Sequence, residues 1–216
     1  MRKIGWIGAG IMGQPMVIHL LNKGYEVHVY ARHPERVEQA KNAGAILEES
    51  IESLTSNVDV ICTMVGFPSD VKEVYDVIFS CIEAGKTCID FTTSSPKLAK
   101  ELYTKGKELG VHVVDAPVTG GDTGAKNGTL TVLVGADKED FETNKEIFEA
   151  FGTQIEYCGK ACCGQHVKMA NQIMIANTLQ GICEAMSYLN CKMWMNLSCI
   201  ASCVMVLLDL NNWNSR

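Results

Sequence analysis

The sequence predicts an α/β fold in which helices cover both faces of a doubly wound, largely parallel sheet. Strand-like and helix-like segments alternate through residues 3–157, the first strand-like run ends in a glycine-rich turn, and 47% of the chain is hydrophobic. Such alternation is typical of parallel strands joined by helices. From Gln165 onward one long helix follows, with no strand after it. We therefore expect a first domain over residues 1–164 and, over residues 165–216, a long interdomain helix that begins an all-α second domain.

The individual elements follow from apolar periodicity and from the positions of glycine and proline. Strands are expected at Lys3–Gly8, Glu26–Tyr30, Val58–Met64, Thr87–Phe91, Val111–Asp115, Thr129–Val134 and Gln154–Tyr157. Helices are expected at Met12–Lys23, Pro34–Ala43, Ser69–Phe79, Pro96–Leu109, Asp137–Phe151 and Gln165–Leu189. Gly24, Gly44 and Gly110 end three of these helices, as glycine commonly does. Ser69 is expected to cap the helix that it begins.

Charge and cysteine usage exclude several classes of protein. The chain has 19 Lys plus Arg against 25 Asp plus Glu, a net charge of −6, and so lacks the basic surface typical of nucleic-acid binders. No uninterrupted apolar run reaches the ~18 residues of a membrane span, and the amino terminus does not resemble a signal peptide. Ten cysteines without regular spacing indicate reduced thiols. We expect a cytoplasmic protein with no nucleic-acid or membrane partner.

The first strand runs directly into a G-x-G-x-x-G motif formed by Gly8, Gly10 and Gly13. In a strand–turn–helix context the first glycine permits a tight turn, the second lets a pyrophosphate approach the backbone, and the third lets the helix pack on the strand. Ile11 and Met12 lie where the amino end of the helix would face the phosphates. The motif predicts a Rossmann-type dinucleotide-binding domain, and an incidental glycine-rich turn is the alternative.

The end of the second strand bears on the choice between the two nicotinamide cofactors. NAD-binding folds usually carry an acid there, which binds the ribose 2′-hydroxyl. This chain has Arg32 and no acid before Glu35. A guanidinium matches the geometry of a 2′-phosphate. We therefore expect NADP as the cofactor, with NAD possible if Arg32 is an ordinary solvated residue.

Four motifs, in the same order, resemble those of the β-hydroxyacid dehydrogenases, a family that includes 3-hydroxyisobutyrate dehydrogenase and tartronate semialdehyde reductase. They are Trp6–Met16, Thr92–Pro96, Asp115–Gly121 and Gly164–Gln172. The resemblance covers residues 1 to about 189. It implies hydride transfer between a nicotinamide cofactor and a small 3-hydroxy acid or its semialdehyde, which is a small carboxylate substrate.

The resemblance also implies roles for single residues. The positions that would line the cofactor are Met64, Val65 and Thr93, and those that would bind substrate are Thr119, Gly120, Gly121, Asn171 and Gln172. Serine is usual where this chain has Thr119; the hydroxyl is retained, and we expect the added methyl to narrow the pocket. Asn171 and Gln172 stand where the 6-phosphogluconate branch would carry His and Asn, which favours small acids as substrates. The loop before the last helix, usually glycine-rich, contains Cys162 and Cys163.

Lys168 is the candidate general acid and base. Oxidation of an alcohol removes a hydroxyl proton together with the hydride, so a positioned group must take that proton and return it in the reverse reaction. Lys168 stands near the start of an apolar helix, three and four residues before Asn171 and Gln172, and such polar groups need partners or a ligand. Burial lowers the pKa of a lysine. A solvated surface lysine is the alternative, and the resemblance favours catalysis.

No metal site is expected. Four potential ligands lie close together in the sequence: Cys158, Cys162, Cys163 and His166. Their spacing is not a usual zinc pattern, because adjacent cysteines rarely both face one metal.

The resemblance ends after Leu189. The family continues into an all-helical domain of roughly 100 residues, a normal domain size, that closes the site and commonly mediates dimerisation. Residues 190–216 have room only for its first helix, so we expect a truncated or frame-shifted product. Two functions stay open: an oxidoreductase, and a non-catalytic NADP-binding remnant.

The helix over 165–189 is apolar on most of its circumference and needs burial on several sides, so we expect self-association through it.

Overall fold

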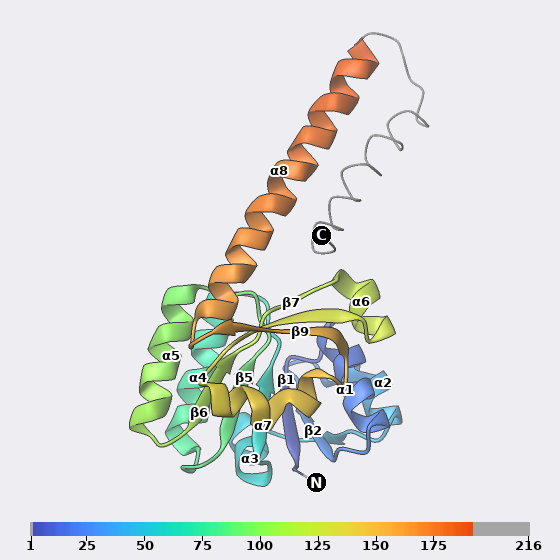
Figure 1. The fold of residues 1–216 in the computed structure, drawn as a ribbon. Helices are drawn as coiled ribbons and strands as arrows, with labels where there is room; N and C mark the ends of the chain where they lie inside the picture. The colour runs from blue at the N-terminus through green and yellow to red at the C-terminus, as the bar shows by residue number, and fades with distance from the viewer. Residues whose placement is uncertain (1, 192–216) are drawn as a thin grey trace. The chain divides into compact units, whose positions relative to one another are not determined.

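The computed structural model describes residues 2–191, and within this range the strands form one mostly parallel sheet (Figure 1). The strand order is β3-β2-β1-β4-β5-β6-β8-β7, and β9 pairs with β8. Strands β1 to β6 pair in parallel, β8 is antiparallel to β6 and β7, and β9 is parallel to β8. The chain moves outward from β1 in one direction and then, from β4, in the other. The predicted doubly wound α/β fold is confirmed.

The elements alternate as the sequence pattern predicted. The strands are β1 (Ile4–Ile7), β2 (Val27–Tyr30), β3 (Ile46–Leu47), β4 (Val60–Thr63), β5 (Thr87–Asp90), β6 (His112–Asp115), β7 (Val118–Thr119), β8 (Leu130–Gly135) and β9 (Gly152–Gly159). The helices are α1 (Gly13–Asn22), α2 (Glu38–Asn42), α3 (Ile51–Asn57), α4 (Pro68–Cys81), α5 (Pro96–Glu108), α6 (Gly121–Asn127), α7 (Lys138–Phe148) and α8 (Cys163–Cys191).

Two hydrophobic clusters form the core, one on each face of the sheet. Successive side chains of a strand point to opposite faces, and β4 shows this directly: Val60 and Cys62 belong to one cluster and Ile61 to the other. Buried residues of α1, α2 and α7 join the first cluster, and those of α3, α4 and α5 join the second. Because both faces are covered, β1, β4 and β5 are buried at every position, which explains why they read as largely apolar runs.

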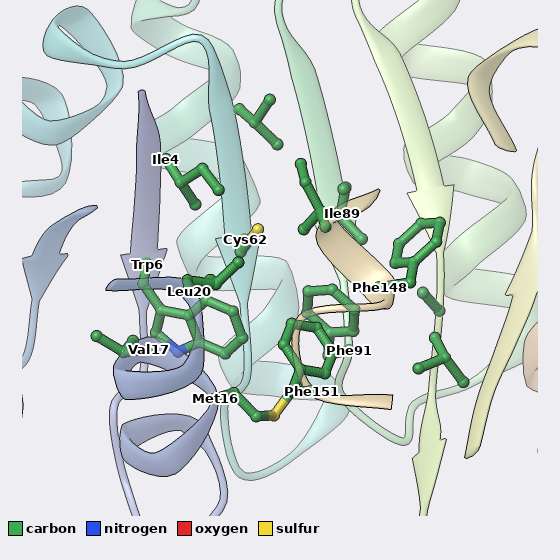
Figure 2. Close-up of a cluster of buried hydrophobic side chains, with 14 of the residues drawn as sticks. Ile4, Trp6, Met16, Val17, Leu20, Cys62, Ile89, Phe91, Phe148 and Phe151 are labelled. Atoms are coloured by element: carbon green, nitrogen blue, oxygen red, sulfur yellow. The ribbon is translucent and has the colours of Figure 1, made fainter. Parts of the chain in front are cut away.

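An aromatic group that includes Trp6, Phe91 and Phe151 lies within the first cluster (Figure 2). Trp6 of β1 stacks on Phe91 with 5.5 Å between ring centroids, and Phe151 meets both rings edge-on. Met16 and Leu20 of α1 are fully buried in the same cluster. This packing holds the start of α1 against the end of β1, where the glycine-rich turn connects them.

Several predicted boundaries were wrong. The expected helix over 34–43 is a 3₁₀ turn, Pro34–Val37, followed by the short α2, because the backbone leaves helical geometry at Val37, which is buried with Ala40. Ser69 is not the cap of α4: the helix begins at Pro68, and the carboxylate of Asp70 accepts the Phe67 amide instead. Four short elements, β3, α3, β7 and α6, were not predicted. Each is two to seven residues long, too short for a periodic pattern to show.

The chain divides into two compact units, Met1–Lys168 and Met169 onward. In the second unit the described part is the remainder of α8. Its apolar side chains are largely exposed: Ile173, Met174 and Leu179 keep 62%, 61% and 60% of their surface. Of the helical domain expected over 165–216, residues 192–216 lie outside the described residues.

Candidate functional site

The three glycines of the first turn are required for different reasons. Gly8 has φ +93°, and a Cβ there would lie 2.2 Å from the Met64 carbonyl oxygen. A Cβ on Gly13 would lie 2.3 Å from the Gly8 carbonyl oxygen and 2.8 Å from Trp6 Nε1. A Cβ on Gly10 would meet nothing within 4 Å, and the φ of Gly10 is not positive. The fold therefore needs glycine at the first and third positions, whereas no contact in the described structure requires it at Gly10.

An open cavity of about 450 Å³ lies above this turn. It is lined by Gly8–Gly13, Ala31–His33, Val37, Met64–Gly66 and Asp70. These residues follow the carboxyl ends of β1, β2 and β4, and the order of the strands reverses between β1 and β4. In doubly wound folds ligands bind in the crevice at such a point. The open space over Gly10 and the amino end of the ten-residue α1 fit a dinucleotide's phosphates.

The structure brings most of the expected cofactor residues to this cavity. Eight of them line it: Gly8, Gly10, Ile11, Met12, Gly13, Arg32, Met64 and Val65. Thr93 is not among the lining residues; it is exposed in the segment between β5 and α5. Thr93 follows Thr92, whose hydroxyl accepts the Val65 amide at 3.0 Å, so the loops after β4 and β5 are joined by a hydrogen bond.

Arg32 has acidic neighbours that the sequence pattern did not reveal. Its Nη2 donates to Asp70 Oδ1 at 3.1 Å and lies 3.8 Å from Glu73 Oε2. Asp70 lies in the first turn of α4, and its other oxygen accepts the Phe67 amide at 3.0 Å. The sequence motif places an acid only at the end of β2, whereas this acid lies 38 residues further along the chain than Arg32. In the sequence, the signal for Asp70 was an acidic residue in the first turn of the helix that begins at Pro68.

A buried carboxylate holds the ends of β4 and β5. Asp90 Oδ1 accepts hydrogen bonds from the Thr63 hydroxyl at 2.8 Å and from the Thr92 amide at 3.1 Å. Burial raises the pKa of Asp90 to about 6, and these donors oppose the rise. The same bonds orient Thr92, and Thr92 in turn holds Val65 at the cavity. The position of the cavity wall therefore depends on Asp90.

A second buried carboxylate caps the start of α8. Asp115, at the end of β6, accepts the Cys162 amide on Oδ1 at 2.6 Å and the Gln165 amide on Oδ2 at 2.8 Å. Burial raises the pKa of Asp115 to about 6, and the backbone donors oppose the rise. A Cβ at Gly135 or Gly164 would come within 2.9 Å of a carboxylate oxygen of Asp115, so both glycines make room for this cap.

Gln165 joins the cap to the loop that follows β5. Its side chain is fully buried, its Oε1 accepts the Ser94 amide at 2.9 Å, and its Nε2 donates to the Thr92 carbonyl at 2.7 Å. Cys162 stands just before the helix with φ +72°, the only non-glycine residue with positive φ among the described residues. The sequence comparison with a glycine-rich loop pointed to this position, whereas the roles of Asp115 and Gln165 were missed.

Lys168 follows this network on α8, three residues after Gln165. It is 6% exposed and makes no hydrogen bond or ion pair with any other described residue. Burial lowers the pKa of its ammonium group. Asn171 and Gln172 follow on α8 in the second unit. The Asn171 Oδ1 atom is shielded from solvent and has no hydrogen-bond partner in residues 2–191.

The predicted substrate loop lies at the end of β7. Thr119 is half-buried and pairs with Thr131 of β8. Gly120 and Gly121 are exposed, with φ +129° and +64°, a backbone that favours glycine. The loop is therefore not a plain turn between two strands, since α6 begins at Gly121.

Two further features of the described residues concern metal ligands and membrane-spanning helices. In the part of the chain that the structure describes, no three His, Cys, Asp or Glu side chains are grouped to hold a metal ion. Cys158, Cys162 and Cys163 are free thiols there. None of the helices within residues 2–191 combines the length and apolar character needed to cross a bilayer.

Known proteins share both the sequence and the fold. The family model described as the NAD binding domain of 6-phosphogluconate dehydrogenase matches residues 3–159. An uncharacterized oxidoreductase of Bacillus subtilis, YkwC, is 47% identical over 190 residues, which cover 87% of this chain and 66% of that protein. The 2-hydroxy-3-oxopropionate reductase of Escherichia coli is 38% identical over 192 residues, covering 86% of this chain and 64% of that protein.

A solved structure of a related protein has the same fold. The Mycobacterium tuberculosis 3-hydroxyisobutyrate dehydrogenase determined with L-serine superposes with a TM-score of 0.85 at 28% identity, covering 90% of this chain and 67% of that one. The chain spans just under two thirds of the length of the two curated relatives. The predicted family and Rossmann-type fold are confirmed: the chain belongs to the NAD(P)-dependent hydroxyacid dehydrogenases that carry a 6-phosphogluconate dehydrogenase type of NAD-binding domain.

Proposed function

We propose that this protein transfers a hydride between NADP(H) and a small 3-hydroxy acid or its semialdehyde, with Lys168 as general acid and base. The observation that carries the proposal is a buried lysine without a protein partner, three residues after Gln165. Gln165 bonds to Thr92, and Thr92 also holds Val65 at the dinucleotide cavity. The Nζ atom of Lys168 is not among the solvent-shielded atoms that lack a partner, so its ammonium group is accessible to a polar group of a substrate.

The proton chemistry follows from the environment of Lys168. A bound nicotinamide cofactor supplies the hydride acceptor or donor. In the direction of reduction, the Lys168 ammonium donates a proton to the carbonyl oxygen of the semialdehyde. In the direction of oxidation, neutral Lys168 takes the hydroxyl proton, and its lowered pKa increases the neutral fraction near pH 7.

The substrate carboxylate is assigned to the loop after β7. The Thr119 hydroxyl and the amides of Gly120 and Gly121 are hydrogen-bond donors, and glycine lets an anion approach the backbone. Asn171 and Gln172 supply amide groups for the remaining oxygens of a small acid. The Asn171 Oδ1 atom has no partner within residues 2–191; it can only accept a hydrogen bond, so it supports binding of a substrate hydroxyl and not of a carboxylate oxygen.

The preference for NADP(H) rests on Arg32. It lines the dinucleotide cavity with a side chain that is 58% exposed and free to turn toward a ligand. Arg32→Asp should weaken NADPH binding more than NADH binding, because it replaces a phosphate-binding charge with one that repels phosphate.

Self-association through α8 is part of the proposal. Ile173, Met174 and Leu179 are more than half exposed in the single chain, and an apolar patch of this kind marks an interface or an aggregation-prone surface. A second copy of the chain is the proposed partner.

The test combines cofactor titration by calorimetry with turnover of a panel of small semialdehydes. Lys168→Ala should lower turnover by ~10²–10⁴ and leave the Kd for NADPH unchanged, since Lys168 does not line the dinucleotide cavity. Lys97→Ala is the matched control, because its side chain is 87% exposed. Near-normal turnover of Lys168→Ala would remove Lys168 from the mechanism. Binding of NADPH by the wild type without any turnover would favour the nucleotide-binding remnant.

A further inference from the structure

The acidic residue that the end of β2 lacks is supplied by α4. Among the residues lining the dinucleotide cavity, Asp70 is the only acid, and Arg32 lines the cavity beside it. The Asp70 carboxylate bonds to Arg32 at 3.1 Å. Glu73, the second acid near Arg32, lies 3.8 Å away, is 73% exposed and lines an adjoining cavity that shares Arg32 with this one. The cavity therefore presents a cation and an anion side by side where the sequence showed only the cation.

The Asp70 carboxylate is held in place, whereas Arg32 is not. Asp70 Oδ2 accepts the Phe67 amide at 3.0 Å, which caps the 14-residue α4, and its side chain is 23% exposed. Rotation away from the cavity would break this hydrogen bond and leave the Phe67 amide without its cap. Arg32 is 58% exposed and has no other hydrogen bond within residues 2–191. A ligand therefore displaces Arg32 from Asp70 more readily than it moves the Asp70 carboxylate.

The Asp70 carboxylate should weaken the binding of NADP(H) and strengthen that of NAD(H), whereas Arg32 favours NADP(H). A 2′-phosphate must take Arg32 from Asp70 and then remain near a fixed carboxylate of like charge. A 2′-hydroxyl can instead donate a hydrogen bond to that carboxylate. Resting on the proposed binding of a nicotinamide dinucleotide, we propose that Asp70 determines cofactor selectivity by penalising NADP(H) and favouring NAD(H), so that Arg32 gives only a modest preference for NADP(H).

The experiment measures the Kd of NADPH and of NADH for the full chain and for Asp70→Asn by calorimetry. Asparagine keeps an oxygen that can accept the Phe67 amide and removes the charge. Partly exposed charge pairs contribute up to ~1 kcal/mol, so the ratio of Kd(NADH) to Kd(NADPH) should rise about fivefold, or more if the phosphate is a dianion. The ratio is taken on one protein, so a partly unfolded sample does not alter it.

Two controls make the result specific. Glu73→Gln removes a more distant and more exposed charge, 3.8 Å from Arg32 in the adjoining cavity, and should change the ratio by less than about twofold. The fragments 2′,5′-ADP and ADP should reproduce the shift of Asp70→Asn, because they differ at the phosphate without a nicotinamide. A shift that shrinks as salt rises supports charge repulsion.

An unchanged ratio in Asp70→Asn, or an equal shift in Glu73→Gln, overturns the role of Asp70 while leaving dinucleotide binding intact. Failure of the wild type to bind either cofactor refutes dinucleotide binding itself, and the inference with it. The two failures are therefore distinguishable.

Discussion

Gly10→Ala separates the requirements of the fold from those of the ligand. A methyl group at Gly10 meets no protein atom within 4 Å, and its backbone is not left-handed. The free energy of unfolding should therefore change by less than ~1 kcal/mol, with a small gain possible from the stiffer unfolded chain. Gly8→Ala and Gly13→Ala place the methyl 2.2–2.3 Å from a carbonyl oxygen and should destabilise the protein by ~1–3 kcal/mol.

In contrast to its small effect on stability, Gly10→Ala should strongly weaken cofactor binding. If a phosphate of the cofactor bonds to the backbone beside Gly10, a methyl group there obstructs it. Loss of one hydrogen bond to a charged group removes ~1.5–3 kcal/mol, which weakens the Kd about 10- to 100-fold. At a cofactor concentration 100 times the wild-type Kd, binding stabilises the wild type by ~2.7 kcal/mol and the variant by only ~0.4–1.4 kcal/mol.

Thermal unfolding with and without NADPH measures both effects. For a chain of this length 1 kcal/mol corresponds to ~2–4 °C in Tm, so the cofactor should raise the wild-type Tm by roughly 5–10 °C and the Gly10→Ala Tm by less than about half of that. Equal cofactor-induced shifts in both proteins would refute the phosphate-binding role of this turn. A large loss of stability in Gly10→Ala without cofactor would show that the fold itself requires the glycine.

Two further predictions concern α8. The pKa of Asp115 is raised by burial to about 6, above the unfolded value of ~3.9, so its contribution to stability is complete below pH ~3.9 and is lost as pH rises through 6. Between pH 5 and 7.5 the wild type should lose ~1–1.5 kcal/mol relative to Asp115→Asn in urea unfolding, and parallel curves would contradict the buried carboxylate. Light scattering should show a dimer or larger species, and Leu179→Lys, which places a charge on the exposed apolar surface of α8, should lower its mass; a wild-type monomer would exclude self-association.

Local signals in the sequence predicted much of the fold and part of the candidate site. The strands β1, β4 and β5 are buried on both faces, so their apolar runs were unmistakable, and the glycines after α1, α2 and α5 marked the helix ends. Gly8 and Gly13 could be assigned because a strand–turn–helix connection constrains them through neighbouring residues. The short elements β3, β7 and α6 could not be predicted, since two to seven residues carry no period and α6 contains two glycines.

Only the tertiary structure brought together residues that are distant in the chain. Asp70 meets Arg32 across 38 residues, Asp115 meets the start of α8 across 47, and Gln165 reaches Ser94 across 71. A sequence pattern records the spacing of residues within one element, whereas these bonds form because parallel strands end at one edge of the sheet and bring their loops together. Lys168 shows the same difference between what the sequence reveals and what only the structure decides. Its position after an Asp-Ala-Pro loop and a helix start was visible in the sequence, but its burial, and hence its lowered pKa, follows from the packing of several elements.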